Sequence, residues 1–103
     1  MDIRIITRHL DRTQALIESV QRQAAYAFAR FADAIDRFEL RITDVNGPRR
    51  GMGIACLARV HFGQGGSLEV EQFDVSAEAG SSRAIERLSN RTRRHLGRHH
   101  RRD

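Results

Sequence analysis

Arginine is the residue type that gives this sequence its clearest chemistry. Eight of the eighteen arginines lie between Arg83 and Arg102, and from residue 83 onward the only acids are Glu86 and Asp103. Residues 1–82 hold ten arginines against eleven acids, so the net charge of +5 comes entirely from the C-terminal segment. The chain contains no lysine, and each of these cations is therefore a planar, permanently charged guanidinium that can hold a phosphate through two hydrogen bonds.

The spacing of these arginines places most of them on one side of a helix. At about 100° per residue, a narrow stripe contains Arg83, Arg87, Arg91, Arg94, Arg98 and Arg101, here named the arginine stripe. The neighbouring side carries Ile85, Leu88, Thr92 and Leu96. A solvated helix face is the simpler interpretation, but arginines four residues apart repel each other, with only Glu86 nearby to relieve them. The pattern favours a helix that packs by one face and binds phosphates beside it.

The other candidate groups do not form a catalytic or metal site. His95 and His99 are four residues apart, but a zinc site needs further ligands, and no cysteine or carboxylate is placed to supply them. Asp33, Asp36 and Glu39 have no partner base. We therefore predict no catalytic residue, no metal, no cofactor and no small-molecule substrate.

The glycine-rich segment and the single cysteine are expected to be structural, and the N-terminus favours a cytoplasmic protein. The segment 63–66 lacks the Lys-Ser/Thr of a P-loop and is typical of a hairpin turn. Cys56 alternates with apolar neighbours, so we expect a core residue, and a single cysteine excludes an internal disulfide. The N-terminus lacks a signal peptide's apolar region and no run is long enough to span a membrane, which favours a cytoplasmic, membrane-free location.

The N-terminal half predicts a strand, a long helix and a second strand. Residues 2–8 are β-branched and nearly alternating, as in a strand. Asp11 or Thr13 can cap a helix, and apolar residues then recur at steps of three and four as far as Ile35. Tyr26 falls outside this apolar stripe and could contact a partner. Residues 38–44 alternate again and predict the second strand.

The C-terminal half predicts two more strands and the arginine-rich helix. Residues 46–48 form a turn that Arg49 and Arg50 extend into a basic loop, and strands follow over 52–62 and 67–75. Residues 77–81 are predicted as a connection, with Ser81 or Ser82 capping the last helix. Gly97 is predicted to end that helix or to fray it, which leaves one domain over 1–97 and a basic tail over 98–103.

The predicted order βαβββα specifies the fold class. Two amphipathic helices and a four-stranded mixed sheet form a two-layer α+β domain with both helices on one face. A right-handed crossover makes the first two strands parallel.

Two segments resemble the ribosome hibernation-promoting factors, the family of the ribosome-associated inhibitor protein Y. The stretch from Ile6 to Leu16, with Thr7-Arg8-His9-Leu10 followed by Thr13-Gln14-Ala15-Leu16, is similar to the family's first strand and helix start. Ala84-Ile85, Leu88 and the basic residues after it are similar to its last helix. Departures include Ser82, where the family commonly has tyrosine, and the absence of room for a second, dimerising domain.

The resemblance implies a short-form, non-enzymatic translation inhibitor that acts under stress or in stationary phase. Its implied partner is the small ribosomal subunit, whose rRNA it would bind in the tRNA and mRNA channel, as a monomer in solution. The expected RNA-binding residues are Arg8, His9, Arg12, Arg83, Arg87, Arg91, Arg94 and Arg98. With few exposed aromatic residues, we expect recognition of folded RNA by shape and backbone more than stacking along a single strand.

Two alternatives remain open at the level of sequence. The same basic helix could serve a general double-stranded RNA or DNA-binding module. It could also meet an acidic protein in a protein-interaction module of the sigma-factor modulation kind.

Overall fold

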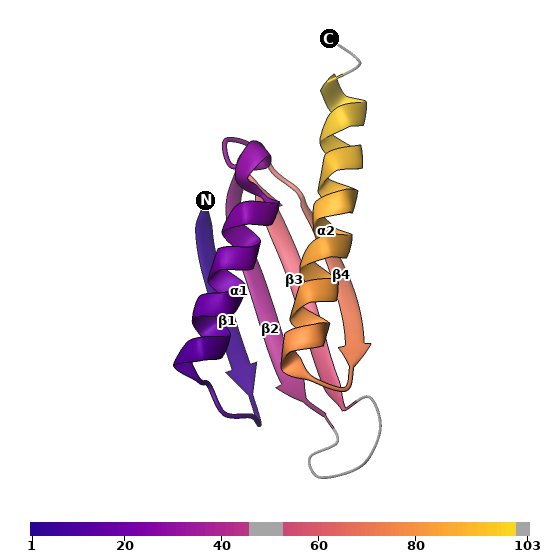
Figure 1. Ribbon diagram of the computed structural model, residues 1–103. Helices are drawn as coiled ribbons and strands as arrows, with labels where there is room; N and C mark the ends of the chain where they lie inside the picture. Colours follow the sequence, from indigo (N-terminus) through magenta and orange to yellow (C-terminus); the bar gives the residue numbers. More distant parts are fainter. Residues whose placement is uncertain (46–52, 101–103) are drawn as a thin grey trace.

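The computed structural model describes residues 1–45 and 53–100, with side chains up to Gly97. The elements are β1 (Asp2–Arg8), α1 (Gln14–Ala27), a 3-10 turn η1 (Ala29–Phe31), β2 (Ile35–Asp44), β3 (Ile54–Phe62), β4 (Ser67–Asp74) and α2 (Ala77–His100) (Figure 1). The predicted order βαβββα is confirmed. The turn at 46–48 and the basic loop with Arg49 and Arg50 lie outside the described residues.

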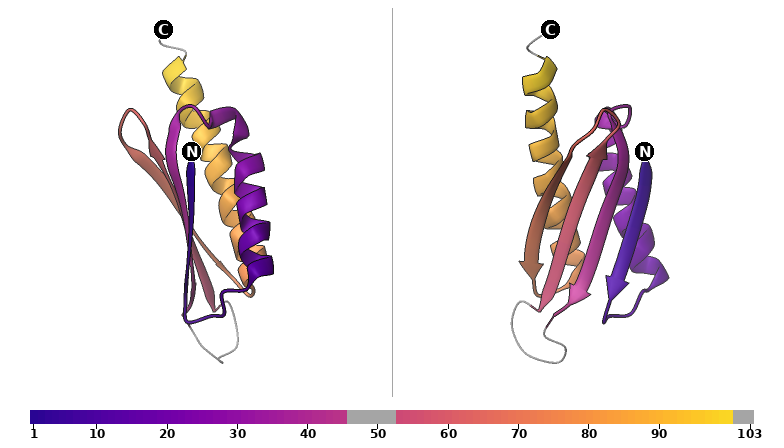
Figure 2. Two further views of the ribbon diagram at one scale, coloured as in Figure 1. Left: turned by 90° about the vertical axis from the view of Figure 1, so that its left-hand side faces the viewer. Right: turned by 180° about the vertical axis from the view of Figure 1, so that it is seen from behind.

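The four strands form one mixed sheet in the order β1-β2-β3-β4. β1 runs parallel to β2, and the other two pairs are antiparallel, so Ile5, Leu40, Ala58 and Val70 lie in one row across the sheet. Both helices cover the same face and leave the other face open (Figure 2). The two-layer α+β architecture predicted from the sequence is confirmed.

The core lies between the sheet and the two helices. The central strands contribute Phe38, Leu40, Ile42, Cys56, Ala58 and Val60, all fully buried. The helices contribute Leu16, Ile17, Val20, Ala24, Ala84, Ile85 and Leu88. Cys56 is a core residue as predicted, and burial raises the pKa of its thiol to about 11, which keeps it protonated and unreactive at neutral pH.

Helix α1 begins as predicted but ends earlier. The Thr13 hydroxyl accepts a hydrogen bond from the Leu16 N–H at 3.1 Å, which confirms this residue as the N-cap. The helix ends at Ala27, and Ile35 is the first residue of β2, not part of the helix. A register shift between Ile35 and Arg37 lets Ile35 and Phe38 face the core together. Ile35 follows Phe31 by four residues, a helical step, which is why the sequence predicted a longer helix.

Helix α2 is longer than predicted at both ends. Its N-terminal N–H groups are capped by Ser76, whose hydroxyl accepts from the Ala79 N–H at 3.1 Å, so the predicted cap at Ser81 or Ser82 is wrong. The helix also continues through Gly97 to His100 and projects beyond the sheet (Figure 1). A single glycine costs a helix about 1 kcal/mol, which is too little to end one that is already formed. Within the described residues, no helix is long and apolar enough to cross a membrane.

Gly80 allows α2 to approach the sheet closely at its first turn. A Cβ atom at this position would lie 2.8 Å from the Cys56 Sγ and 3.3 Å from the Asp74 Cβ. Real Cβ atoms do not tolerate the first distance, so a larger residue would push α2 away from β3 and β4.

We predict opposite effects for the same substitution at two positions of α2. Gly80→Ala should lower the free energy of unfolding by about 1–3 kcal/mol because it overpacks the contact with Cys56. Gly97→Ala should leave stability unchanged or raise it by up to about 1 kcal/mol, since nothing lies within 4 Å of its Cβ position. Urea denaturation measures both. Equal effects at the two sites would contradict this packing.

Candidate nucleic-acid interface

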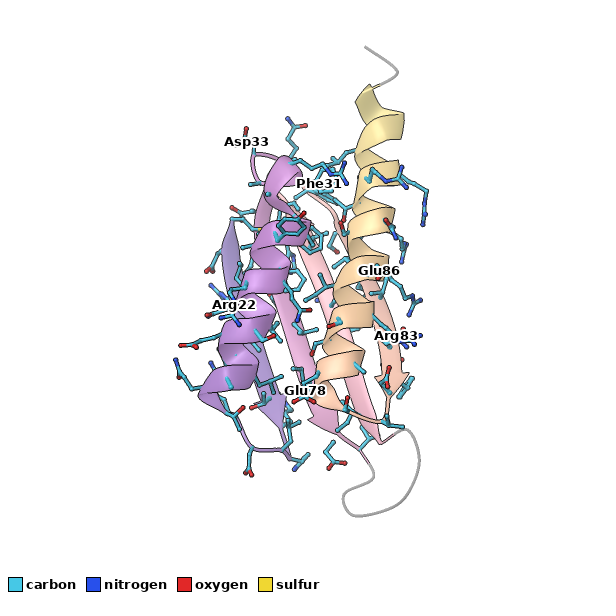
Figure 3. All side chains as sticks on the ribbon, viewed as in Figure 1. Arg22, Phe31, Asp33, Glu78, Arg83 and Glu86 are labelled. Carbon is cyan, nitrogen blue, oxygen red and sulfur yellow. The ribbon has the colours of Figure 1, made fainter. Side chains whose placement is uncertain are left out.

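The arginine stripe lies along the side of α2 that borders β4. Arg83, Arg87, Arg91 and Arg94 are all exposed, while Ile85, Leu88 and Thr92 on the adjoining face are buried. Figure 3 places Arg83 on this outer side of the helix, away from α1. The structure therefore confirms the predicted amphipathic helix, with its apolar face buried and its arginines exposed. The side chain of Arg98, whose backbone continues the helix, lies outside the described residues.

The edge of the sheet holds two of these side chains. Arg87 donates from Nη1 to the Glu71 carbonyl at 2.8 Å and to the Gln72 side-chain oxygen at 2.9 Å. Arg91 donates from Nη1 to the Glu69 carbonyl at 2.7 Å. Because β4 is an edge strand, these carbonyls have no partner strand on that side. The arginines thus supply hydrogen-bond donors to the edge carbonyls, and the same bonds hold the guanidinium groups in place.

The stripe keeps most of its hydrogen-bonding capacity and its charge. A guanidinium has five N–H donors, so one or two bonds to β4 leave others pointing to solvent. Arg83 forms a 3.6 Å ion pair with Asp74 and remains 71% exposed. Among the described residues, no acid forms an ion pair with Arg87, Arg91 or Arg94. The side of α2 along β4 is therefore a row of exposed cations, in which β4 orients Arg87 and Arg91 and an acid pairs with Arg83.

The open face of the sheet is charge-balanced and does not suit an anion. Arg4, Glu39, Arg59 and Glu69 stand opposite one another in a row across the four strands. Ion pairs join Arg59 to Glu69 and, at 2.7 Å, Arg37 to Glu39. Such alternating ion pairs stabilise the pairing of the strands and leave little net electrostatic field on this face. The candidate interface is thus on the helical side and the β4 edge.

The junction of β1 and α1 lies at the opposite edge of the sheet from the stripe. Arg8 and His9 are exposed there, and Arg12 donates from Nη1 to the Ile5 carbonyl at 2.7 Å. β2 and β3 separate this junction from β4. The sequence suggested that these residues extend one track beside α2, but the structure places them as a separate group. Arg12 thus donates to a carbonyl of the edge strand β1, as Arg87 and Arg91 donate to carbonyls of the edge strand β4.

His9 has the backbone conformation that side chains usually avoid. Its φ is 61°, in the left-handed region, where histidine is more common than most residues but glycine is favoured. The strand turns into the helix at this point, and the turn directs Arg8 and His9 to solvent. Backbone strain of this kind at an exposed junction supports a functional role for the side chain.

The search for a metal site concerns only the part of the chain that the structure describes. No group of three histidine, cysteine, aspartate or glutamate residues is arranged to hold an ion there. His95 stacks on Phe62 with ring centroids 4.9 Å apart, which packs the projecting part of α2 against the end of β3.

The structure also forms a groove that the sequence did not indicate. It runs between α1 and α2, encloses about 600 Å³ and is here named the interhelical groove. Its walls include Gln23, Tyr26 and Arg30 from the α1 side and Ser82, Glu86 and Asn90 from α2. The signal available in the sequence was Tyr26, which lies outside the apolar stripe and is 89% exposed.

We predict that His9→Gly raises stability and lowers affinity for RNA. Glycine adopts a positive φ without steric cost, so the free energy of unfolding should rise by up to about 1 kcal/mol. Affinity for RNA should fall because the imidazole is lost. His9→Asn, which also tolerates this φ, is the control for backbone strain. A loss of stability in His9→Gly, measured by urea denaturation, would contradict a strained junction.

Comparisons with known proteins identify the fold. No protein-family model and no curated protein sequence matches the chain. Among solved structures, the protein Y N-terminal domain of Thermus thermophilus superposes with a TM-score of 0.74 at 24% identity, covering 91% of this chain and 98% of that one. A ribosomal subunit interface protein from Coxiella burnetii superposes with a TM-score of 0.74 at 13% identity, covering 94% and 99%. The chain has the fold of these proteins, as the resemblance of its two motifs predicts.

Proposed function

We propose that this chain is a non-enzymatic, ribosome-associated hibernation factor that binds the rRNA of the small subunit in the tRNA and mRNA channel. The observation that carries the proposal is the arginine stripe, held along α2 by the edge of β4, on a chain with the protein Y fold over nearly its whole length. One of the two similar structures is a protein Y domain, and the other is a ribosomal subunit interface protein. Expression under stress or in stationary phase belongs to the same proposal.

Phosphate neutralisation explains how such a surface binds. Each arginine that contacts a phosphate releases condensed counterions, so affinity falls as salt rises. Arg87 and Arg91 lose little conformational freedom on binding, because β4 already holds them. The projecting end of α2 extends the cationic row away from the sheet, where a deep RNA channel can surround it.

Inhibition by this mechanism requires occupancy alone. A folded domain seated where tRNA and mRNA must pass excludes them by volume and by charge, with no bond made or broken. We propose that Arg83, Arg87, Arg91, Arg94 and Arg98 contact phosphates, and that Arg8, His9 and Arg12 make a second, separate contact.

The salt dependence of binding tests the role of the stripe. Arg91→Gln should weaken binding to purified small subunits and lower the slope of log affinity against log salt by about one. Arg41→Gln is the matched control, because Arg41 is exposed on the charge-balanced face of β2 and the substitution removes the same charge. Filter binding at four salt concentrations measures both variants. An affinity that does not change with salt, or equal effects of both variants, would refute the role of the stripe.

The same assay with duplex RNA separates the ribosome from a general nucleic-acid partner. A ribosome-specific protein should bind small subunits at least about tenfold more tightly than duplex RNA at one salt concentration. Equal affinities would favour a general duplex-binding module.

Sedimentation in sucrose gradients tests the proposed condition of action. The protein should be found in ribosomal fractions of lysate from starved cells, and high salt should remove it because its contacts are mainly ionic. Lysate treated with nuclease is the control for a protein partner. Absence from ribosomal fractions in both growing and starved cells would reject the proposal.

A further inference from the structure

None of the residues that line the interhelical groove belongs to the arginine stripe. It lies between α1 and α2, and its volume of about 600 Å³ is in the range of small-molecule sites, about 300–1,000 Å³. Two of the serines that line it form hydrogen bonds to the α1 side: Ser82 donates to Gln23 at 2.8 Å, and Ser89 donates to the Ala27 carbonyl at 3.1 Å. These bonds tie the two helices together and fix the width of the groove.

Tyr26 offers an aromatic ring to solvent at the wall of this groove. The side chain is 89% exposed, although a tyrosine usually buries most of its ring. Arg30, four residues later, also lines the groove and is exposed. At about 100° per residue, Arg93 lies on the same face of α2 as Glu86, and it is exposed. An open aromatic face with arginines nearby is suited to a nucleobase and its flanking phosphates.

Glu86 determines which chemical groups the groove can accept. This carboxylate is exposed on α2 (Figure 3), and its side chain has no hydrogen bond or ion pair among the described residues. A carboxylate repels phosphate, so a surface that bound phosphates alone would gain by losing it. It accepts hydrogen bonds strongly, and Asn90, also exposed, lies one turn further along the helix. The groove therefore suits a neutral ligand whose edge donates hydrogen bonds.

We propose that the interhelical groove binds one unpaired guanine that is extruded from folded RNA. The base stacks on Tyr26, and its N1–H and N2–H groups donate to the two carboxylate oxygens of Glu86. Adenine and uracil each present an acceptor on the same edge, which the carboxylate repels. Arg30 and Arg93 lie on either side for the neighbouring phosphates. This inference rests on the proposed function and adds a base-reading site to its phosphate contacts.

A single extruded base is the occupant that the geometry favours over a run of single-stranded RNA. Tyr26 is the one aromatic residue that lines the groove, whereas binding along a strand uses several stacked rings. The groove is closed on its floor by Ala27 and by Ile85, which is 3% exposed. One planar ring fits against such a floor, and the backbone of the RNA remains outside with the arginines.

Intrinsic fluorescence gives a direct test, because Tyr26 is the only tyrosine and the chain has no tryptophan. The probes are RNA hairpins that are identical except for one bulged nucleotide (guanine, adenine, uracil or none). The bulged-guanine hairpin should quench Tyr26 and bind at least about fivefold more tightly than the fully paired one. Filter binding measures the variants, because they lack the only tyrosine: Tyr26→Ala should abolish this preference, while Tyr26→Phe, which keeps a ring for stacking, should retain it.

Glu86→Gln tests the reading of the base edge separately. Removing the negative charge should tighten binding to every hairpin, yet reduce the preference for guanine over adenine to less than about twofold. A guanine preference that survives Glu86→Gln or Tyr26→Ala overturns the site. Quenching by an acidic peptide, but by no hairpin, overturns it as well and assigns the groove to a protein partner.

The proposed function and the groove fail in distinguishable ways. If all four hairpins bind equally, with affinity that falls steeply with salt and depends on Arg91, the guanine site is rejected and phosphate binding stands. If small subunits also fail to bind, the proposed function is rejected and the site with it.

Discussion

The close packing of α2 on the sheet is the constraint on which the interface depends. Gly80 leaves no side chain at the first turn, so the helix lies against Cys56 and Asp74. Ala84, Leu88 and Thr92 continue the contact, and the Thr92 hydroxyl is satisfied by donating to the Leu88 carbonyl at 2.8 Å. Once this face is fixed, the rotation of the helix is fixed too. The arginine stripe must then run along β4, and Glu86 must face α1.

This arrangement gives the arginines two purposes. An unpaired strand edge invites association with another chain. Arg87 and Arg91 cover the β4 edge, and Arg12 covers the β1 edge, by donating to the carbonyls of Glu71, Glu69 and Ile5. The same bonds orient cations that would otherwise sample many rotamers. Protection of the sheet and preparation for an anionic partner therefore follow from one set of hydrogen bonds.

The helical side of the domain combines two kinds of contact. In the proposed function, the stripe supplies charge that positions RNA without reading its sequence, and in the further proposal the interhelical groove supplies an aromatic ring and a carboxylate that read one base. The open face of the sheet, with its alternating ion pairs, contributes neither. The two proposals together would let a small domain hold a large RNA while recognising one position in it.

Most of the fold could be read from local patterns. Alternation predicted the strands, with β1 assigned at its observed bounds, and the Thr13 cap located the start of α1. The errors occurred where local signals compete. The four-residue step from Phe31 to Ile35 imitated helical spacing, and several small residues around Ser76 and Ser81 offered equivalent caps for α2. Gly97 was taken as a helix end because propensity ignores the helix already formed before it.

The sequence by itself determined the element order, the apolar faces and the concentration of arginine on one helix, because these depend on periodicity and residue type. Only the tertiary structure decided what lies beside those arginines. It separated Arg8, His9 and Arg12 from the stripe by two strands, joined Arg87 and Arg91 to the β4 edge, and brought Tyr26 to the same groove as Glu86. These relations join residues far apart in the chain. They follow from how the helices pack on the sheet, which no local pattern specifies.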